Sequence, residues 1–242
     1  MTAILLPATP NSAVSAHRTW DYWRPAGSGI VELGTVRGLD VALPVHFHEE
    51  DQVTFVLAGR RRFVLGDERF DVAAGQGVHI PAGTPHRSLC EPSEVVCINL
   101  YMPSGACAVR DLIAALAGHW RKTGRIGWPD LTLLAEDHRC RLPAGAGRVG
   151  GMPDGTPCAT VGEAAQRAGM SREGFSRRFR RSHGMPPHAF WLLEKLNAAR
   201  RLLRKGEPIA AVAADTGFSD QSHLGRCFRR AFGVTPGRYR AG

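Results

Sequence analysis

The sequence predicts an α+β multidomain protein, in which an N-terminal β-barrel is followed by helices and then by an all-α C-terminal domain. Three observations support this fold class. Residues 30–100 alternate short apolar stretches with Gly, Pro and acidic turns, which indicates an all-β barrel or sandwich. The excess of basic residues is confined to the last third of the chain. That third also contains an imperfect internal repeat, which predicts duplicated helical motifs.

We expect five segments along the 242 residues. They are a tail at 1–15, a β-barrel module at 16–104, a helical segment at 105–140, a linker at 141–158 and a helical module at 159–242. A chain of this length can bury a core in each module without disulfide bonds.

No targeting or membrane segment is expected. The sequence has no run of 18 apolar residues, and its first 15 residues lack the basic start of a signal peptide. The six cysteines form no CxxC pair, so we expect reduced thiols in a cytoplasmic protein, with a redox sensor as the alternative.

Positive charge is concentrated in the last third of the chain. Residues 159–242 carry 16 Lys and Arg against 6 Asp and Glu, a net charge of +10, whereas residues 1–158 carry 15 against 16, a net charge of −1. A neutral module joined to a basic one indicates that only the second meets a polyanion such as DNA. A basic surface that serves only solubility would show the same charge, so the motifs have to decide.

The basic third contains two copies of one motif. Residues 161–171 read VGEAAQRAGMS and residues 209–219 read IAAVAADTGFS. In each copy a small-residue helix is followed by a glycine, Gly169 or Gly217, where a tight turn between helices needs a positive φ. A serine, Ser171 or Ser219, then stands where its hydroxyl can cap a second helix.

The similarity continues beyond the serines, with one extra residue in the second copy. The segments SREGFSRRFRRSHGMPP and SDQSHLGRCFRRAFGVTP align at an offset of 49 positions. Helical spacing of the apolar positions predicts a second helix in each copy with one buried face and one exposed face. We interpret the repeat as a duplicated helix-turn-helix, with these matching pairs: Phe175 and Leu224, Phe179 and Phe228, Gly184 and Gly233, Phe190 and Tyr239.

One helix is expected between the two copies, over residues 186–205 (PPHAFWLLEKLNAARRLLRK). Prolines suit its first turn, and Gly206 and Pro208 end it. Its apolar stripe would fix the two motifs relative to one another, and consists of Phe190, Leu193, Leu196 and Leu203.

Residues 195–236 closely resemble the signature of the AraC/XylS family of regulators, and GFSDQSHLGRCFRRAFGVTP is the most diagnostic part. The resemblance covers about residues 159–241. It implies a seven-helix DNA-binding domain whose two recognition helices enter successive major grooves. It also implies a transcription regulator that binds double-stranded DNA, and RNA polymerase as a partner if the protein is an activator.

The first turns of each second helix are expected to read DNA. Arg177 and Arg226 are the main candidates for base contacts, because arginine can bond bidentately to guanine. Arg180 and Arg229 are expected on phosphates or on an ordinary solvated face, and Glu173 could accept from a cytosine amine. The full expected set is Arg172, Glu173, Ser176, Arg177 and Arg180 in copy one, and Asp220, Gln221, Ser222, His223 and Arg226 in copy two.

The β-rich region contains two motifs in order, and it resembles the cupin ligand-binding domain of many AraC-type regulators. The first motif is His46, His48, Gln52 and Gly59, and the second is Gly75, Pro81, Gly83 and His86. The resemblance implies a barrel whose interior binds a small-molecule effector at His46, His48, Gln52 and His86.

In metal-binding cupins the equivalents of those four residues hold a divalent ion. Here Gln52 replaces the usual Glu, and Cys90 stands where an Asn is common, so the ligand set is degraded. A metal site, a pocket for an organic effector, and hydrogen-bonded barrel residues without a ligand all remain open. A cupin enzyme such as a dioxygenase or isomerase is the rival function. The fused basic repeat argues against it, and we expect no catalytic residue.

An amphipathic helix is expected after the barrel, with Val109, Leu112, Ile113, Leu116 and Trp120 on one face. Helices at this place dimerise proteins of the family, which implies a homodimer, and packing back on the barrel is an equally good interpretation. Residues 141–157 (RLPAGAGRVGGMPDGTP) are Gly/Pro-rich and are interpreted as a linker.

The sequence therefore predicts a cytoplasmic, effector-responsive regulator that binds specific DNA. Because the linker is no rigid lever, an effector would act through dimer geometry or through docking of the two modules. The alternative is a constitutive DNA-binding protein whose cupin is only a dimerisation scaffold.

Overall fold

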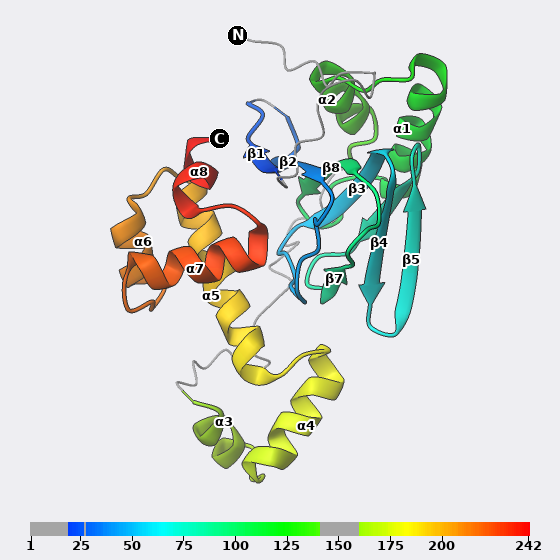
Figure 1. Cartoon of the computed structure of the whole chain (residues 1–242). Helices are drawn as coiled ribbons and strands as arrows, with labels where there is room; N and C mark the ends of the chain where they lie inside the picture. The colour runs from blue at the N-terminus through cyan, green and yellow to red at the C-terminus, as the bar shows by residue number, and fades with distance from the viewer. Residues whose placement is uncertain (1–18, 27, 141–159) are drawn as a thin grey trace.

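A computed structural model describes residues 19–26, 28–140 and 160–242 (Figure 1). The expected tail at 1–15 and the expected linker at 141–158 lie outside the described residues. None of the described helices is long and apolar enough to cross a membrane.

Strands of the N-terminal half form two sheets that face each other. The five-stranded sheet has the order β1-β2-β8-β3-β6 and the three-stranded sheet the order β5-β4-β7. The strands are β1 Thr19–Trp23, β2 Glu32–Gly38, β3 Asp51–Ala58, β4 Arg60–Leu65, β5 Glu68–Ala73, β6 Gly77–Ile80, β7 His86–Ser88 and β8 Val95–Met102. Strand β1 precedes the β-rich region that the sequence predicted, and it pairs antiparallel with β2.

The alternation of side chains along β3 separates two cores. Val53 and Phe55 face outward into a cluster with α1, whereas Val56 belongs to the core between the sheets. Because side chains of a strand alternate between its two faces, Gln52 shares the inner face with Val56. The register of β3 therefore places a polar side chain inside the barrel.

Two helices cover the outer face of the five-stranded sheet. They are α1 Val109–Thr123 and α2 Trp128–Asp137. Leu112 and Leu116 of α1 are fully buried with Phe55, and Trp120 lies edge-on to Phe55 at 6.3 Å between ring centroids. The predicted apolar face thus packs back on the barrel, which is the second of the two interpretations that the sequence left open. Leu133 of α2 is 62% exposed.

The C-terminal part of the described chain is helical. Its helices are α3 Val161–Arg167, α4 Arg172–His183, α5 Pro187–Arg204, α6 Ile209–Asp215, α7 Gln221–Phe232 and α8 Pro236–Ala241. The long helix α5 lies where residues 186–205 predicted one, and Gly206 follows it with a φ of +85°. The helix-turn-helix pairs α3–α4 and α6–α7 lie on either side of α5 (Figure 1).

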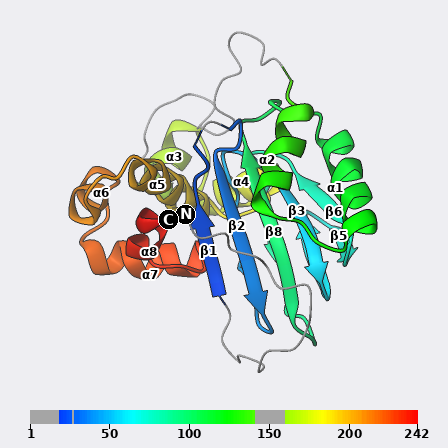
Figure 2. The ribbon, with the colours of Figure 1, turned by 90° about the horizontal axis from the view of Figure 1, so that it is seen from above.

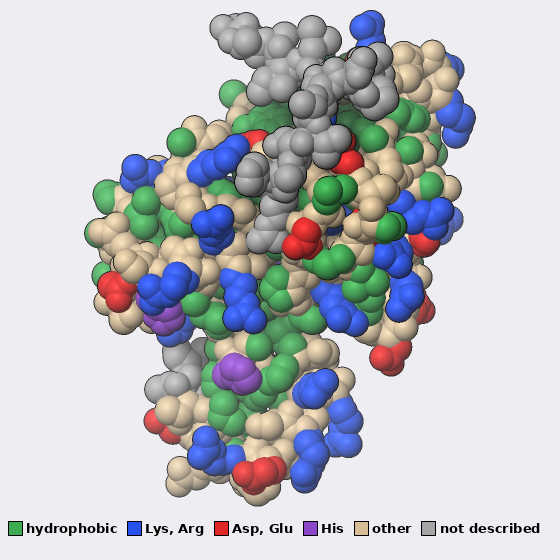
Figure 3. Space-filling view, in the orientation of Figure 1, with side chains coloured by type: hydrophobic (Ala, Val, Ile, Leu, Met, Phe, Trp, Pro, Cys, Tyr) green, Lys and Arg blue, Asp and Glu red, His purple; other side chains and the backbone are tan. Residues whose placement is uncertain are grey.

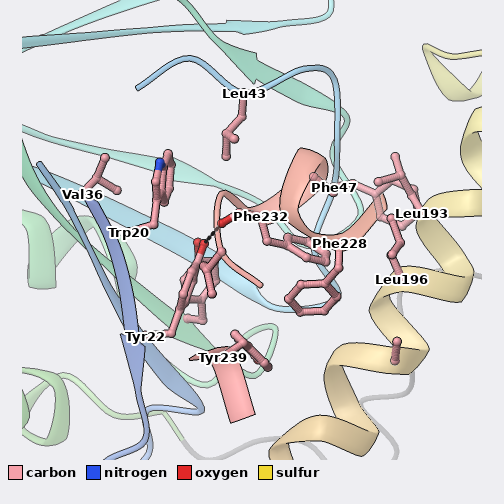
Figure 4. Close-up of a cluster of buried hydrophobic side chains, with 14 of the residues drawn as sticks. Trp20, Tyr22, Val36, Leu43, Phe47, Leu193, Leu196, Phe228, Phe232 and Tyr239 are labelled. Carbon is pink, nitrogen blue, oxygen red and sulfur yellow. Dashed lines mark hydrogen bonds between the residues drawn. The ribbon is translucent and has the colours of Figure 1, made fainter. Parts of the chain in front are cut away.

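The helices dock directly on the barrel, and the two modules share one hydrophobic core. Figure 2 shows α7 and α8 beside β1, at the edge of the five-stranded sheet that is far from α1. Figure 4 shows the contact itself, in which Trp20 and Tyr22 of β1 face Phe232 and Tyr239. The hydroxyl of Tyr22 donates to the carbonyl of Phe232 at 3.0 Å.

Candidate functional site

The first candidate recognition helix, α4, begins at the cap that the sequence predicted. The hydroxyl of Ser171 accepts a hydrogen bond from the N–H of Gly174 at 3.1 Å. Phe179 is buried against the core and Phe175 is half-buried. The opposite face is open to solvent. Of the expected contacts on it, Ser176 is half-buried and the others are exposed, namely Arg172, Glu173, Arg177 and Arg180.

The second candidate recognition helix, α7, is capped by a different residue from the one predicted. Asp220, and not Ser219, is the N-cap, and its Oδ1 accepts from the N–H of His223 at 2.8 Å. The prediction of Ser219 was wrong because the extra residue of the second copy places Asp220 at the position equivalent to Ser171. The hydrogen bond from the His223 N–H lowers the pKa of Asp220, so the cap is a carboxylate at neutral pH.

The expected DNA contacts of α7 lie on its first two turns. Gln221, Ser222 and Arg226 are exposed, whereas His223 is half-buried. The Nδ1 of His223 and the hydroxyl of Ser219 share a hydrogen bond of 3.2 Å. Asp220 and His223 therefore have roles in holding the helix start, and Gln221, Ser222 and Arg226 are open to a ligand.

Three further exposed arginines lie on the same helices and were not in the expected set. They are Arg178, Arg181 and Arg230. The triplet FRR, which occurs in both copies at 179–181 and 228–230, was the signal for two of them. Basic side chains are visible over both helical units on one face of the molecule (Figure 3). This distribution suits contact with phosphates along a duplex.

Between the two sheets, the structure brings His46, His48 and His86 together. His46 and His86 form an isolated β-bridge, and the three ring centroids lie 4.3 to 5.1 Å apart. One nitrogen of each ring lies within 4.8 Å of the others. All three side chains are buried.

The three imidazoles are neutral at pH 7. Burial lowers the pKa of His46 and of His48 well below the usual value, and neighbouring rings and Arg200 lower it further. Burial also lowers the pKa of His86 to about 4. Neutral imidazole is the form that binds metals or hydrogen-bonds polar ligands.

Hydrogen bonds at Nδ1 assign the tautomers. The Nδ1–H of His46 donates to the carbonyl of Pro44 at 2.8 Å, and that of His86 donates to the carbonyl of Thr84 at 2.9 Å. Their Nε2 atoms therefore keep a lone pair. His48 is the opposite case, because Nη1 of Arg200 lies 3.1 Å from its Nδ1 and a guanidinium can only donate. The proton of neutral His48 is consequently on Nε2.

The donor set fits a divalent metal poorly. His48 has no free lone pair while Arg200 holds its Nδ1, so two imidazoles remain. The side-chain orientation of Gln52 is set by its amide nitrogen, which donates to Thr54 Oγ1 at 2.8 Å and to Asn99 Oδ1 at 3.3 Å. Cys90, which stands where an Asn is common, is exposed, and its thiol lies 3.3 Å from Oδ1 of Asp40.

His46 and His86 line a small cavity that one residue of the helical module helps to close. The free volume is about 10 Å³, which is room for about one water molecule. The wall consists mainly of aromatic and polar barrel residues, and Phe232 at the end of α7 completes it. The lining residues that matter below are Trp20, His46, Gln52, Arg61, His86 and Phe232.

Sequence reasoning missed Arg61, which is the one cation in the wall of this cavity among the described residues. Arg61 is 2% exposed, and its guanidinium carbon lies 5.6 Å from the ring centroid of Trp20. Its Nη2 donates to the hydroxyl of Ser88 at 3.0 Å, whereas its Nε and Nη1 have no partner. Burial lowers the pKa of Arg61. Alternation along β4 places Arg61 on the opposite face from Arg60 and Arg62, but the three residues RRR do not by themselves show which face is buried.

Sequence reasoning also missed Arg200, which connects the histidines to the helical module. Arg200 lies on α5, is 1% exposed, and forms an ion pair with the buried Glu32. Its Nε donates to the hydroxyl of Tyr239 at 3.1 Å. Burial alone would lower the pKa of Arg200, but Glu32, Tyr239 and Glu50 raise it well above the usual value. The Arg200 guanidinium is thus a charged link between His48 of the barrel and α8.

Comparison with known proteins supports both modules. A family model described as a helix-turn-helix domain matches residues 164–242, and one described as a cupin domain matches residues 38–99. The HTH-type transcriptional regulator MtrA of Neisseria gonorrhoeae is 39% identical over 74 residues, which is 30% of this chain and 25% of MtrA. An AraC-like transcription regulator of Streptomyces antibioticus is 27% identical over 180 residues, which is 67% of this chain and 55% of that protein.

Among solved structures, an AraC-type transcriptional regulator of Chromobacterium violaceum is 31% identical and has a TM-score of 0.32. The similarity covers 34% of this chain and 74% of that chain. The chain spans between a quarter and about half of the length of the two curated relatives described above.

Proposed function

We propose that this chain, an AraC-type helix-turn-helix protein with a cupin domain, regulates transcription by binding specific sites on double-stranded DNA. The observation that carries the proposal is the pair of helices α4 and α7. Both are capped at their first turn, both bury one apolar face, and both present arginines to solvent at equivalent positions, Arg177 and Arg226. Such helices place their N-terminal turns in the major groove.

The test is a footprint on a specific site selected from random DNA. Since α4 and α7 belong to one subunit, each monomer should protect two major-groove segments about 10 base pairs apart. Protection of a single groove segment per monomer would remove α4 from the interface. No selected sequence at all would overturn the proposal.

We further propose that a small-molecule effector in the cupin cavity controls DNA binding. The support is the direct contact between the modules, in which Arg200 of α5 meets His48 and Phe232 of α7 lines the cavity. A ligand that changes these contacts would bind the docked and undocked arrangements with different affinities, which is what coupling requires. If the promoter response of the His46→Ala, His48→Ala double variant equals that of wild type, the constitutive scaffold is the better interpretation.

The partners follow from this role. We propose a homodimer that uses a surface other than the apolar face of α1, because that face is buried against the sheet. RNA polymerase is the further partner if the protein is an activator. We also propose a cytoplasmic location, because a regulator has to reach the DNA that it binds. We propose no enzymatic activity, because the curated relatives described above are transcription regulators.

A further inference from the structure

We propose that the cupin cavity is built for a small organic carboxylate, which pairs with Arg61 and displaces Phe232 of α7 from the cavity wall. This inference rests on the proposed function, in which the cavity controls DNA binding, and it names the chemical class of the effector. Three observations carry it, namely a buried cation without a counter-ion, an excess of unpartnered donors, and a wall that belongs to the other module.

Arg61 is the first observation. Within the described part of the chain, no carboxylate lies within 4 Å of its guanidinium. By contrast, Arg62 pairs with Glu91, and the fully buried Arg200 pairs with Glu32. Two of the three guanidinium nitrogens of Arg61 donate to nothing. A buried charge without a partner is strongly unfavourable, and an anionic ligand would remove that cost.

The unpartnered atoms around the cavity are mostly donors. Trp20 Nε1 and Arg61 Nε and Nη1 belong to lining residues, are buried without a hydrogen bond, and all three carry a proton. Among the lining residues, one acceptor also has no hydrogen bond, namely the Oε1 of Gln52. Protons in excess of acceptors suit an anion with several lone pairs, and a carboxylate accepts at two oxygens in the geometry that a guanidinium offers.

The volume of the cavity implies that something moves when a carboxylate enters. About 10 Å³ is room for one water and is too small for even the smallest carboxylates. The strands around the cavity are held by ladders of backbone hydrogen bonds. Phe232 is joined to the barrel by side-chain packing and by one hydrogen bond, from the Tyr22 hydroxyl to the Phe232 carbonyl. The weakest wall is therefore the end of α7.

Displacement of Phe232 would change the DNA-binding module directly. Phe232 is the last residue of α7, the helix that carries Gln221, Ser222 and Arg226 at its start. Its ring also lies 5.2 Å from the guanidinium carbon of Arg200, so the link from α5 to the barrel is disturbed together with α7. The carboxylate would thus favour an arrangement in which α7 and α8 are released from β1.

The experiment uses the full chain and pairs of probes that differ in charge but hardly in shape. Acetate and acetamide, and benzoate and benzamide, are titrated into wild-type protein at constant ionic strength while Trp fluorescence and the melting temperature are recorded. We expect saturable changes with a carboxylate and none with the matching amide. Equal responses to acid and amide, or a response to chloride with none to either carboxylate, would overturn the proposal.

Two variants test the role of Arg61. Arg61→Met removes the charge and keeps the length, and Arg60→Met is the matched control, because Arg60 is the preceding residue of β4 and pairs with Asp71 on the exposed face. Without any probe, Arg61→Met should melt at a higher temperature than wild type, since an unpaired buried charge is gone. Its affinity for the carboxylate should fall about tenfold or more, while Arg60→Met binds as wild type does. A lower melting temperature of Arg61→Met together with unchanged carboxylate affinity would overturn the proposal.

A third variant tests the wall. Phe232→Leu retains an apolar side chain and shortens it, so benzoate should bind more tightly than to wild type, whereas acetate should gain less. Equal benzoate affinity would show that Phe232 does not close the site. DNA affinity of each variant without probe is measured in parallel. If wild-type protein binds carboxylates but no specific DNA, the proposed function is wrong and the anion site is supported. If wild-type protein binds specific DNA but no carboxylate, the proposed function is supported and the anion site is wrong.

Discussion

Each of the two recognition helices has residues that stabilise its start and other residues that can contact DNA. The carboxylate of Asp220 caps α7, and His223 shares a hydrogen bond with Ser219. Arg177 and Arg226 occupy equivalent positions, are exposed, and make none of the hydrogen bonds or ion pairs described above. They are therefore ready to bond to bases without first losing a partner.

Replacement of Arg226 by alanine should separate specific from nonspecific binding. We expect a loss of about 1–3 kcal/mol on the selected site and a much smaller loss on random DNA, because a bidentate bond to guanine carries sequence information. Competition gel shifts at fixed salt measure both affinities. Arg229→Ala is the control, for which we expect similar losses on both DNAs, and the same pattern in Arg226→Ala would reassign Arg226 to a phosphate.

At the scale of elements, the repeat places two glycines at the ends of α4 and α7. Gly184 and Gly233 both adopt the left-handed conformation, with φ of +70° and +79°. Their surroundings differ, however. A Cβ on Gly184 would lie 3.5 Å from Pro85, which is an ordinary contact, whereas a Cβ on Gly233 would lie 2.6 Å from the indole of Trp20. At this position the second copy therefore packs more closely against the barrel than the first.

Alanine at these two glycines should therefore have unequal effects on stability. Gly184→Ala should lower the free energy of unfolding by about 1–2 kcal/mol, which is the cost of a left-handed non-glycine residue. Gly233→Ala should lower it by more, because the indole of Trp20 must also shift. Urea denaturation of both variants gives the difference. Equal losses would mean that Trp20 yields freely and that α7 is not tightly docked.

At the scale of the whole molecule, the two modules behave as one folded unit, since a continuous core runs from Trp20 to Tyr239. The charged centre of this interface is Arg200, with Glu32 fully buried beside it. Removal of one partner of a buried ion pair leaves an uncompensated charge, which is far more damaging than loss of a surface pair.

Arg200→Met should consequently destabilise the whole chain by about 3–5 kcal/mol. The added substitution Glu32→Gln should restore part of this loss, because it removes the orphaned carboxylate. Arg201→Met is the control on the same helix, since its partner Glu49 is only partly buried, and we expect a loss below about 1 kcal/mol. The free energy of unfolding in urea measures all four proteins. If Arg200→Met is no more destabilising than Arg201→Met, the interface is held by its apolar contacts alone.

Local patterns were enough for the elements. The turn glycines Gly169 and Gly217 have positive φ, α5 runs between the predicted prolines and Gly206, and Ser171 caps α4, because each depends on neighbours within a few residues. The cap of α7 was mispredicted by one position, since two adjacent residues, Ser219 and Asp220, could each accept the same N–H. Strand β1 was missed because its aromatic residues are buried by helices that are about 200 residues away in the sequence.

By itself the sequence determined that the chain consists of a β-rich module and a basic, duplicated helix-turn-helix module, because period, turn residues and charge are local properties. Only the tertiary structure decided how the modules meet. Arg61 and Arg200 look like any other arginines in the sequence, and their burial follows from strand register and from docking. The closed cavity likewise depends on Phe232, which is brought to His46 and His86 from a distant part of the chain. Contacts of this kind arise from packing between elements, and no pattern along the chain encodes them.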